Sequence, residues 1–419
     1  MTQVREFESL RPVPRWVRIW AVITATVAIS LLFVLGGFVT SFRVGMADPI
    51  WPTEPWYLLG QNWRSLEFGF LVEHTHRAAG WIVGLLVTVL ALGAWSATPS
   101  RGLRWFGLAA MLLLLMQYGE FHRGMMAVEA ARQQGTPAAM IPVPMTSGVG
   151  SLLGAFLVLL AAGIGVVEGR FGCWTRALAA VTLIAVMIQG LLGGFRVYLN
   201  ELLGPELAAV HGAFGQVVFT LFVTVAILAA PRSDGDCLAE DERRRLRLWS
   251  IALPVSVFVQ LVWAVWLRHL GSPLAQRLHI LTAFVVTGLA VVLINQILSR
   301  SSTRQPLGFL AYHLLGLIAL QLLLGVESWM EKFAAAGPHA SVPPELRPIE
   351  VSGAALRTAH AVIGAALLAA SVALALRIGR LPISRDSDLV ATVSGNLNQL
   401  HTDLEYAAVG TDNSAPRTV

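Results

Sequence analysis

The chain alternates long apolar stretches with short polar connections, and this alternation predicts membrane-spanning helices. A bilayer has a hydrocarbon core about 30 Å thick and a helix rises about 1.5 Å per residue, so a span needs roughly 20 apolar residues. Ten stretches qualify as candidates, near 17–42, 69–95, 104–118, 149–167, 176–199, 207–230, 249–267, 278–298, 309–327 and 355–377. The third is the shortest, because Glu120 and Arg123 follow it closely, so a re-entrant or tilted helix remains an alternative there. The pattern predicts an all-α polytopic membrane protein.

Composition and charge support this class of protein. Of the 419 residues, 55% are hydrophobic and only 13% are charged, which excludes an ordinary soluble enzyme. Basic residues gather in alternate connections, at Arg5, Arg11, Arg15 and Arg18, then Arg101 and Arg104, Arg170 and Arg176, Arg243, Arg244, Arg245 and Arg247, Arg300 and Arg304, and Arg377, Arg380 and Arg385. Such loops resist translocation, so both termini are predicted to be cytoplasmic in a multi-pass protein of the cell (inner) membrane. Topology explains the basic character, and no nucleic acid partner is expected.

Four histidines recur at matching places in the apolar stretches. They are His76, His211, His279 and His360, and the residues four positions later are Gly80, Gly215, Ala283 and Gly364. Residues at i and i+4 share a helix face, so a flat, bulky group can lie against the backbone while the imidazole reaches its centre. Haem iron accepts axial imidazoles, and two histidines from facing helices fill both axial positions. The repeat predicts bis-histidine haem ligation, although each histidine taken singly could be an interhelical hydrogen-bonding residue.

A second repeat indicates that the chain contains two related four-helix units. Gln189-Gly190-Leu191-Leu192-Gly193 resembles Gln321-Leu322-Leu323-Leu324-Gly325, and each precedes a loop and a histidine-bearing span. The predicted topology places all four histidines toward the outer face. The expected divisions are a cytoplasmic segment 1–16, a first bundle 17–230 with inserted helices in 97–175, a cytoplasmic linker 231–248, a second bundle 249–380 and a disordered cytoplasmic tail 381–419.

The polar residues nearest these histidines are candidates for chemistry. Glu73 and Arg77 share a helix face with His76, and an ionisable residue within a bilayer is a functional candidate. The alternative is an interfacial salt bridge between Glu73 and Arg77. Arg43 and Arg196 follow Gly-Gly pairs at the outer ends of spans. Their guanidinium groups suit haem propionates, and simple interfacial anchoring is the alternative.

Together these residues resemble the haem A synthase family, membrane enzymes that convert haem O into haem A for terminal oxidases. The similar stretches are Gly36 to Ser41, Gly45 to Pro52, Glu73 to Arg77, Gln189 to Val197, His211-Gly212, Gln276 to His279, and His360. The resemblance covers most of residues 20–380 apart from the insertion. Two features depart from it: the ten spans exceed the family's eight, and the cysteine pair of many relatives is missing, because Cys173 and Cys237 fall in predicted cytoplasmic loops.

The resemblance implies a role for each residue that matches. His76 and His211 would face the substrate haem O, Glu73 would be the catalytic carboxylate, and His279 with His360 would ligate haem B as iron ligands. The reaction would oxidise the C8 methyl group of the ring to a formyl group through successive hydroxylations. Implied partners are haem O, haem A, the lipid bilayer, a protohaem farnesyltransferase and cytochrome oxidase assembly proteins, and a homo-oligomer remains open. The rival interpretation is a non-catalytic dihaem cytochrome b that only passes electrons.

Overall fold

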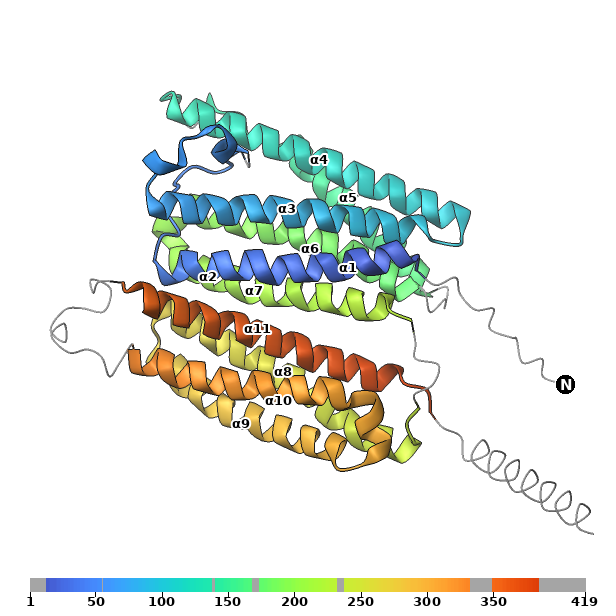
Figure 1. The fold of residues 1–419 in the computed structure, drawn as a ribbon. Helices are drawn as coiled ribbons and strands as arrows, with labels where there is room; N and C mark the ends of the chain where they lie inside the picture. Colours follow the sequence, from blue (N-terminus) through green and yellow to red (C-terminus); the bar gives the residue numbers. More distant parts are fainter. Residues whose placement is uncertain are drawn as a thin grey trace, which may run out of the picture.

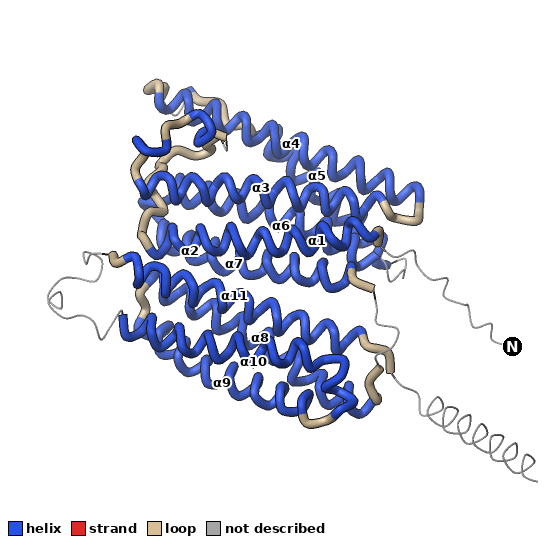
Figure 2. Tube along the Cα trace, viewed as in Figure 1, coloured by secondary structure: helices blue, strands red, loops and turns tan. Residues whose placement is uncertain are grey.

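The structure, a computed structural model, consists of long helices lying side by side (Figure 1). It describes residues 13–54, 56–137, 140–167, 173–231, 237–331 and 349–383. In these ranges ten helical segments are long and apolar enough to cross a membrane, which confirms the all-α polytopic class. Figure 2 shows helices joined by loops throughout the described part of the chain.

The helices follow one another without any intervening strand in the described ranges. They are α1 (Arg15–Val27), which continues through a π-helical segment (Ala28–Phe33) into α2 (Val34–Ser41), then α3 (Phe68–Ser96), α4 (Arg101–Gln133), α5 (Met145–Val167), α6 (Cys173–Tyr198), α7 (Asn200–Ala229), α8 (Glu240–Leu270), α9 (Pro273–Leu298), α10 (Ser301–Trp329) and α11 (Val351–Arg380). Two short 3₁₀ helices, Tyr57–Gly60 and Trp63–Ser65, lie in the connection before α3.

The helices form two four-helix bundles and one additional pair. In the first bundle α1 and α2 pack with α3 and α7, and α6 closes the ring between α3 and α7. Helices α8, α9, α10 and α11 form the second bundle, and α11 and α8 pack on α7 and α2 of the first (Figure 1). The pair α4 and α5 packs on the outside of α3 and α6. The predicted two bundles with two inserted helices are therefore present.

The third span differs from its sequence-based limits. Helix α4 continues to Gln133, so the first half of the segment 119–148, which was expected to be an outer loop, is helical. The charged residues that seemed to end the span, Glu120 and Arg123, lie three residues apart in this helix and form an ion pair with each other. A span predicted from hydropathy ends at such a charged pair, whereas the backbone hydrogen bonds of the helix continue past it. The helix is full length, and the re-entrant alternative is wrong.

The linker between the bundles is also shorter than the predicted 231–248. Helix α8 begins at Glu240, so the arginine run from Arg243 to Arg247 is helical. Buried Glu242 accepts a hydrogen bond from the Ser302 hydroxyl (2.7 Å), which joins this turn to the start of α10. The tail expected from 381 to 419 lies outside the described residues after Ile383, as do residues 1–12 of the N-terminal segment.

Local sequence explains the connections that set the bundle geometry. Gly271 ends α8 in the left-handed conformation (φ 63°), and Ser272 then caps α9 by accepting a hydrogen bond from the Ala275 amide. Glycine adopts this backbone conformation without a steric penalty, so two residues suffice for the turn. In α7, Pro205 follows a non-helical residue, Leu203, which marks a kink before His211. A proline in a helix interior removes a backbone hydrogen bond and bends the helix.

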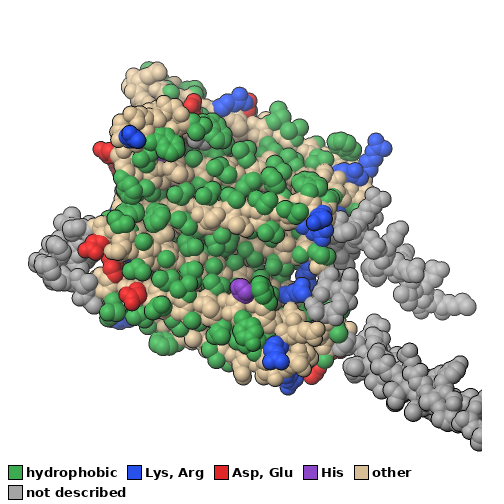
Figure 3. Space-filling model, viewed as in Figure 1, with side chains coloured by type: hydrophobic (Ala, Val, Ile, Leu, Met, Phe, Trp, Pro, Cys, Tyr) green, Lys and Arg blue, Asp and Glu red, His purple; other side chains and the backbone are tan. Residues whose placement is uncertain are grey.

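The outer surface of the molecule has the character expected of a protein in lipid. Figure 3 shows hydrophobic side chains spread over the face turned to the viewer, with charged side chains mainly toward its edges. Exposed large side chains include Phe284 on α9 and Phe309 on α10. An apolar belt of this extent fits a hydrocarbon environment.

Candidate functional site

The four helices that carry the repeated histidines, α3, α7, α9 and α11, all begin at the same end of the molecule, which we call the histidine end. Alternate spans run in opposite directions, so this arrangement follows from the order of the ten spans. The histidines lie about two to three turns inside their helices, which begin before the apolar stretches do.

Glu73 on α3 is a buried carboxylate, only 5% exposed. Its Oε1 accepts a hydrogen bond from Arg77 Nη2 (2.9 Å), one turn further along the helix. Its Oε2 accepts from the backbone N–H of Asp48 (2.8 Å), which lies in the connection between α2 and α3. The salt bridge between Glu73 and Arg77, which was the alternative interpretation of these residues, is therefore present, and the same carboxylate also holds this connection against α3.

Asp48 is the counterpart of Glu73 in the connection and is even more buried, at 2% exposed. One carboxylate oxygen, Oδ2, accepts from Arg77 Nη1 (3.0 Å) and lies 3.1 Å from His74 Nδ1. Arg77 also donates to the backbone carbonyls of Asp48 and Ile50. We call Asp48, Glu73, His74 and Arg77 the acid cluster. It closes the connection over the start of α3. Asp48 belongs to the stretch Gly45 to Pro52 that resembles the family, but its contacts with Glu73 and Arg77 were not predicted from the sequence.

His74 faces away from His76 and belongs to the acid cluster. It is 1% exposed, and its ring stacks on Phe70 with centroids 5.4 Å apart. Its Nε2 is buried without a hydrogen-bond partner. These contacts agree with the interpretation of His74 as a structural neighbour of the repeated histidine.

His76 and His211 are the histidine pair of the first bundle. A Cβ atom on Gly36 of α2 would lie 3.0 Å from His76 Cε1, and one on Gly193 of α6 would lie 3.4 Å from His211 Cε1. Each imidazole edge thus rests against a glycine of a neighbouring helix. The Nδ1 atom of His76 is buried without a partner, and His76 is close enough to act electrostatically on His211.

His279 and His360 are the pair of the second bundle, and their rings lie close together, roughly perpendicular to each other. The ring centroids are 6.2 Å apart and the planes are inclined by 80°. His279 Nδ1 lies 3.4 Å from the Gln260 carbonyl oxygen, a contact that leaves Nε2 free when Nδ1 carries the proton. His360 Nδ1 is buried without a partner.

The duplication seen in the sequence also holds in three dimensions. Gln189 Nε2 lies within 3.3 Å of both ring nitrogens of His211, and Gln321 Nε2 lies 3.4 Å from His360 Nε2. Cβ atoms on Gly215 and Gly364 would each lie 3.3 Å from the matching glutamine Nε2. The small residue four positions after these two histidines therefore accommodates a glutamine. At Gly80, by contrast, a Cβ atom would meet nothing within 4 Å.

The arrangement of these histidines is compatible with axial ligation of a planar metal complex. A metal–imidazole bond is about 2 Å long, so two imidazoles on opposite sides of one metal have ring centroids roughly 6 Å apart. The 6.2 Å separation of His279 and His360 agrees with this value. A backbone carbonyl beside the other ring nitrogen, as at His279, is the usual way in which a metal-binding histidine is oriented. Buried nitrogens without protein partners, at His76 and His360, are available for the same purpose.

The two arginines expected near the ligands lie at the histidine end. Arg196 is in the last turn of α6, and its guanidinium packs against the backbone of Gly45. Its Nε is buried without a partner, and its charge acts on both His76 and His211. Arg43 lies just beyond α2 in the left-handed backbone conformation (φ 57°). The structure thus brings Arg196 to the first histidine pair.

The inserted helices contribute an aromatic cluster beside the connection. His122 of α4 packs edge-on against Trp81 of α3 (centroids 4.9 Å apart) and Trp51 of the connection (6.2 Å). Trp51 also contacts the Tyr198 ring and lies directly against Gly194. Helix α4 therefore holds Trp51, and with it the connection, in place.

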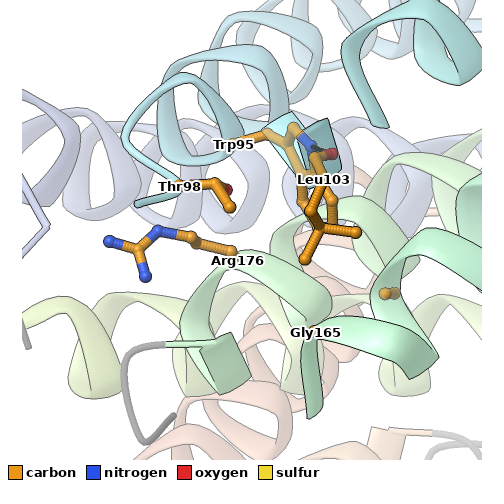
Figure 4. Close-up of a pocket in the computed structure, with 6 residues that line it drawn as sticks. Trp95, Thr98, Leu103, Gly165 and Arg176 are labelled. Carbon is orange, nitrogen blue, oxygen red and sulfur yellow. Dashed lines mark hydrogen bonds between the residues drawn. The ribbon is translucent and has the colours of Figure 1, made fainter. Parts of the chain in front are cut away.

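One recess lies away from the histidines, near the opposite end of the first bundle. Figure 4 shows Trp95, Thr98, Leu103, Gly165 and Arg176 around it, from α3, the turn before α4, α4, α5 and α6. It leaves no room for the centre of a water-sized molecule. A haem-sized ligand does not fit there, so the candidate site remains at the histidine pairs.

Comparisons of the chain with protein-family models, with curated proteins and with solved structures gave no match. The functional argument therefore depends on the geometry above. Besides the contacts of Asp48, the sequence did not predict the contact of Gln260 with His279, nor those of Gln189 with His211 and of Gln321 with His360. The repeat of the two Gln-x-x-x-Gly motifs was the available signal for the last two.

Proposed function

We propose that the protein is a haem A synthase, which oxidises the C8 methyl group of haem O to a formyl group and so yields haem A for a terminal cytochrome oxidase. The observation that carries this proposal is buried Glu73, held three residues before His76 on α3. The second histidine pair has no such carboxylate, because Gln276 and Arg357 occupy the positions three residues before His279 and His360. One pair is thus equipped for acid–base chemistry and the other is not.

In this proposal the two pairs hold different groups. His76 and His211 bind the substrate haem O, with Arg196 beside them to receive a propionate. His279 and His360 hold haem B, which supplies a one-electron carrier within the membrane when it is bound. The spacing of the second pair and the glycine-lined imidazole edges of the first support these assignments.

The acid cluster defines what Glu73 does. Each of its oxygens accepts one hydrogen bond, from Arg77 and from the Asp48 amide, and an ionised carboxylate has further lone pairs. Glu73 is therefore fixed in position while still able to accept a proton released as the methyl group is oxidised. Asp48 and Arg77 orient it, and the connection that they close restricts water at this end of α3.

We further propose that both termini are cytoplasmic and that the histidine end faces the outer side of the cell (inner) membrane. The arginine-rich turns support this orientation, because Arg243 to Arg247 and Arg377 to Arg380 lie at the end opposite the histidines. A protohaem farnesyltransferase, which makes haem O, and cytochrome oxidase assembly proteins, which receive haem A, are the expected partners.

A second candidate is a dihaem cytochrome b that transfers electrons without changing haem. The Glu73–Arg77 ion pair favours the cytochrome, because a carboxylate in such a pair can serve only to anchor the connection. Both candidates use the four histidines. Only the synthase needs the carboxylate for chemistry, so Glu73 separates them.

The test is to express the full chain in cells that make haem O and to analyse the extracted haems. Glu73→Gln keeps an oxygen acceptor for the Asp48 amide but removes the base. We expect haem A formation to fall by about 10²-fold or more, the usual contribution of an acid–base group, while haem B stays bound. Glu67→Gln is the matched control, because Glu67 is exposed just before α3 and its side chain makes no capping hydrogen bond. Unchanged haem O alongside a fully reducible dihaem spectrum in the parent protein would instead establish the cytochrome.

A further inference from the structure

Arg268, in the last turn of α8, joins the two bundles at the histidine end. Its Nη2 donates to the Gly37 carbonyl oxygen (2.8 Å) and to the Ser41 hydroxyl (2.6 Å), both on α2 of the first bundle. A Cβ atom on Gly37 would lie only 2.6 Å from Thr358 Cγ2 of α11, so three helices meet here. Arg268 is thus a cation inserted into the junction between the bundles.

The charge of Arg268 is not balanced by a protein carboxylate in the described ranges. Both of its hydrogen-bond acceptors are neutral oxygens, and no ion pair includes it. Another cation, Arg357, lies close enough to interact with it electrostatically, and Arg357 is itself paired with Glu331. A partly buried charge with only neutral partners is costly, and an oxyanion would remove most of that cost.

The position of Arg268 connects this charge to the second histidine pair. Ser41 Oγ, which accepts from Arg268, also lies 3.0 Å from Thr358 Oγ1. Leu261, two turns before Arg268 on the same face of α8, packs against Gly364, which follows His360 by one turn on the antiparallel helix α11. Arg268 therefore lies about one turn nearer the histidine end than His360. A planar group centred between His279 and His360 would extend toward it. Arg268 ends the first helix of its bundle, much as Arg43 follows α2 in the other.

We propose that Arg268 binds a carboxylate of the ligand held by His279 and His360. A guanidinium has five N–H donors in a planar fork, and the two contacts to α2 leave the other donors for a carboxylate. The chemistry fits a propionate of a tetrapyrrole, so this inference rests on the proposed haem at the second pair. It adds that loading this site also neutralises the junction between the bundles. A phospholipid phosphate would offer the same oxyanion from another source.

The test compares iron protoporphyrin IX with its dimethyl ester, which lacks both carboxylates. The full-length protein, made in haem-deficient cells and carrying His211→Ala to disable the first pair, is titrated with each probe by Soret absorbance. We expect the acid to bind about tenfold or more tightly than the ester, as for a charge-assisted hydrogen bond. Arg268→Gln should reduce this difference to about twofold or less, and Arg268→Lys, which keeps the charge, should give an intermediate difference.

Ser41→Ala is the matched control, because it removes one contact of Arg268 with α2 but keeps the cation. It should retain the full acid–ester difference. Equal binding of acid and ester by the parent, or an undiminished difference in Arg268→Gln, would overturn the assignment. An undiminished difference combined with loss of a copurifying phospholipid, measured by mass spectrometry, would assign Arg268 to lipid. If the protein forms no haem A but still binds the acid more tightly than the ester, the proposed synthase activity is refuted and the role of Arg268 stands. If neither probe changes the Soret absorbance, the proposed haem site at the second pair and the role of Arg268 are both refuted.

Discussion

The imidazoles of His279 and His360 lie with centroids 6.2 Å apart and planes inclined by 80°, although 81 positions separate them in the chain. This is the separation that two axial ligands of one metal require. Neither ring is held by a side-chain carboxylate in the described contacts; a backbone carbonyl and a glutamine amide are their nearest polar neighbours. The pair therefore has the spacing that the proposed haem would need.

Removing either histidine of this pair should empty one site and leave the other loaded. We expect His279→Ala and His360→Ala each to lower the haem content of the purified protein from about two per chain to about one, since a single axial bond holds haem weakly. Pyridine haemochrome assay and the low-spin electron paramagnetic resonance signal measure this. His313→Ala is the control, because His313 is exposed on α10 and bonds to the Phe309 carbonyl of its own helix. Two haems per chain in His360→Ala would contradict the assignment.

Gly36 is expected to be intolerant of a side chain, because its neighbour is the ring of His76. A Cβ atom there would lie 3.0 Å from His76 Cε1, and overpacking of this kind costs about 1–3 kcal/mol. Gly36→Ala should shift the spectrum of the first site and weaken haem binding there by about tenfold or more. Gly84→Ala, where a Cβ atom would meet nothing within 4 Å, should leave both unchanged. Equal effects of the two substitutions would rule out contact with His76 as the cause.

Arg77 is expected to be the main stabilising residue of the connection before α3. Arg77→Ala leaves the buried carboxylates of Asp48 and Glu73 without their cation, and breaking such a pair costs about 3–5 kcal/mol. Faster hydrogen exchange in residues 47–53 and a lower thermal midpoint in detergent should report this loss. Arg123→Ala, which breaks the exposed pair with Glu120 on α4, should change stability by about 1 kcal/mol or less. Unchanged exchange in residues 47–53 of Arg77→Ala would show that other contacts hold the connection.

The proposed orientation can be tested through Cys237, which is exposed and free just before α8. In a Cys173→Ser background, a membrane-impermeant maleimide should label Cys237 in inverted vesicles and not in intact spheroplasts. A second chain, with both natural cysteines replaced and Gln134→Cys introduced after α4, should give the opposite result. Labelling of Cys237 in intact spheroplasts would show that the protein has the opposite orientation in the membrane.

Much of the architecture could be predicted from the sequence, since hydropathy reports burial in lipid directly. The ten spans, the two related bundles and the inserted pair were all predicted from the sequence. Helix ends were not, as α4 shows, because Glu120 and Arg123 neutralise each other within a helix that hydropathy alone would end. The propensity to form a helix and the preference for lipid are separate properties, and the hydropathy pattern reports only the preference for lipid.

The candidate site was predicted less completely, for a physical reason. The histidines form a repeat along the chain, so a single sequence displays them. Asp48 and Arg268 act through partners that the fold brings from other elements, Glu73 on α3 and Ser41 on α2. Contacts between residues of different elements follow no fixed separation in the sequence, so a single sequence does not reveal them. The Glu73–Arg77 salt bridge could be foreseen as the alternative to a functional Glu73, because an i, i+4 relationship within a helix is local.

The placement of α4 and α5 determines how a molecule dissolved in the bilayer can reach the first histidine pair. The inserted pair covers the seam between α3 and α6, and the second bundle covers the side of α7 and α2. The seams between α1 and α3 and between α6 and α7 are not covered by these helices. If the protein is the proposed synthase, a substrate that arrives laterally would meet one of these two seams. The insertion thereby gives the first bundle a direction of approach that an isolated four-helix ring does not have.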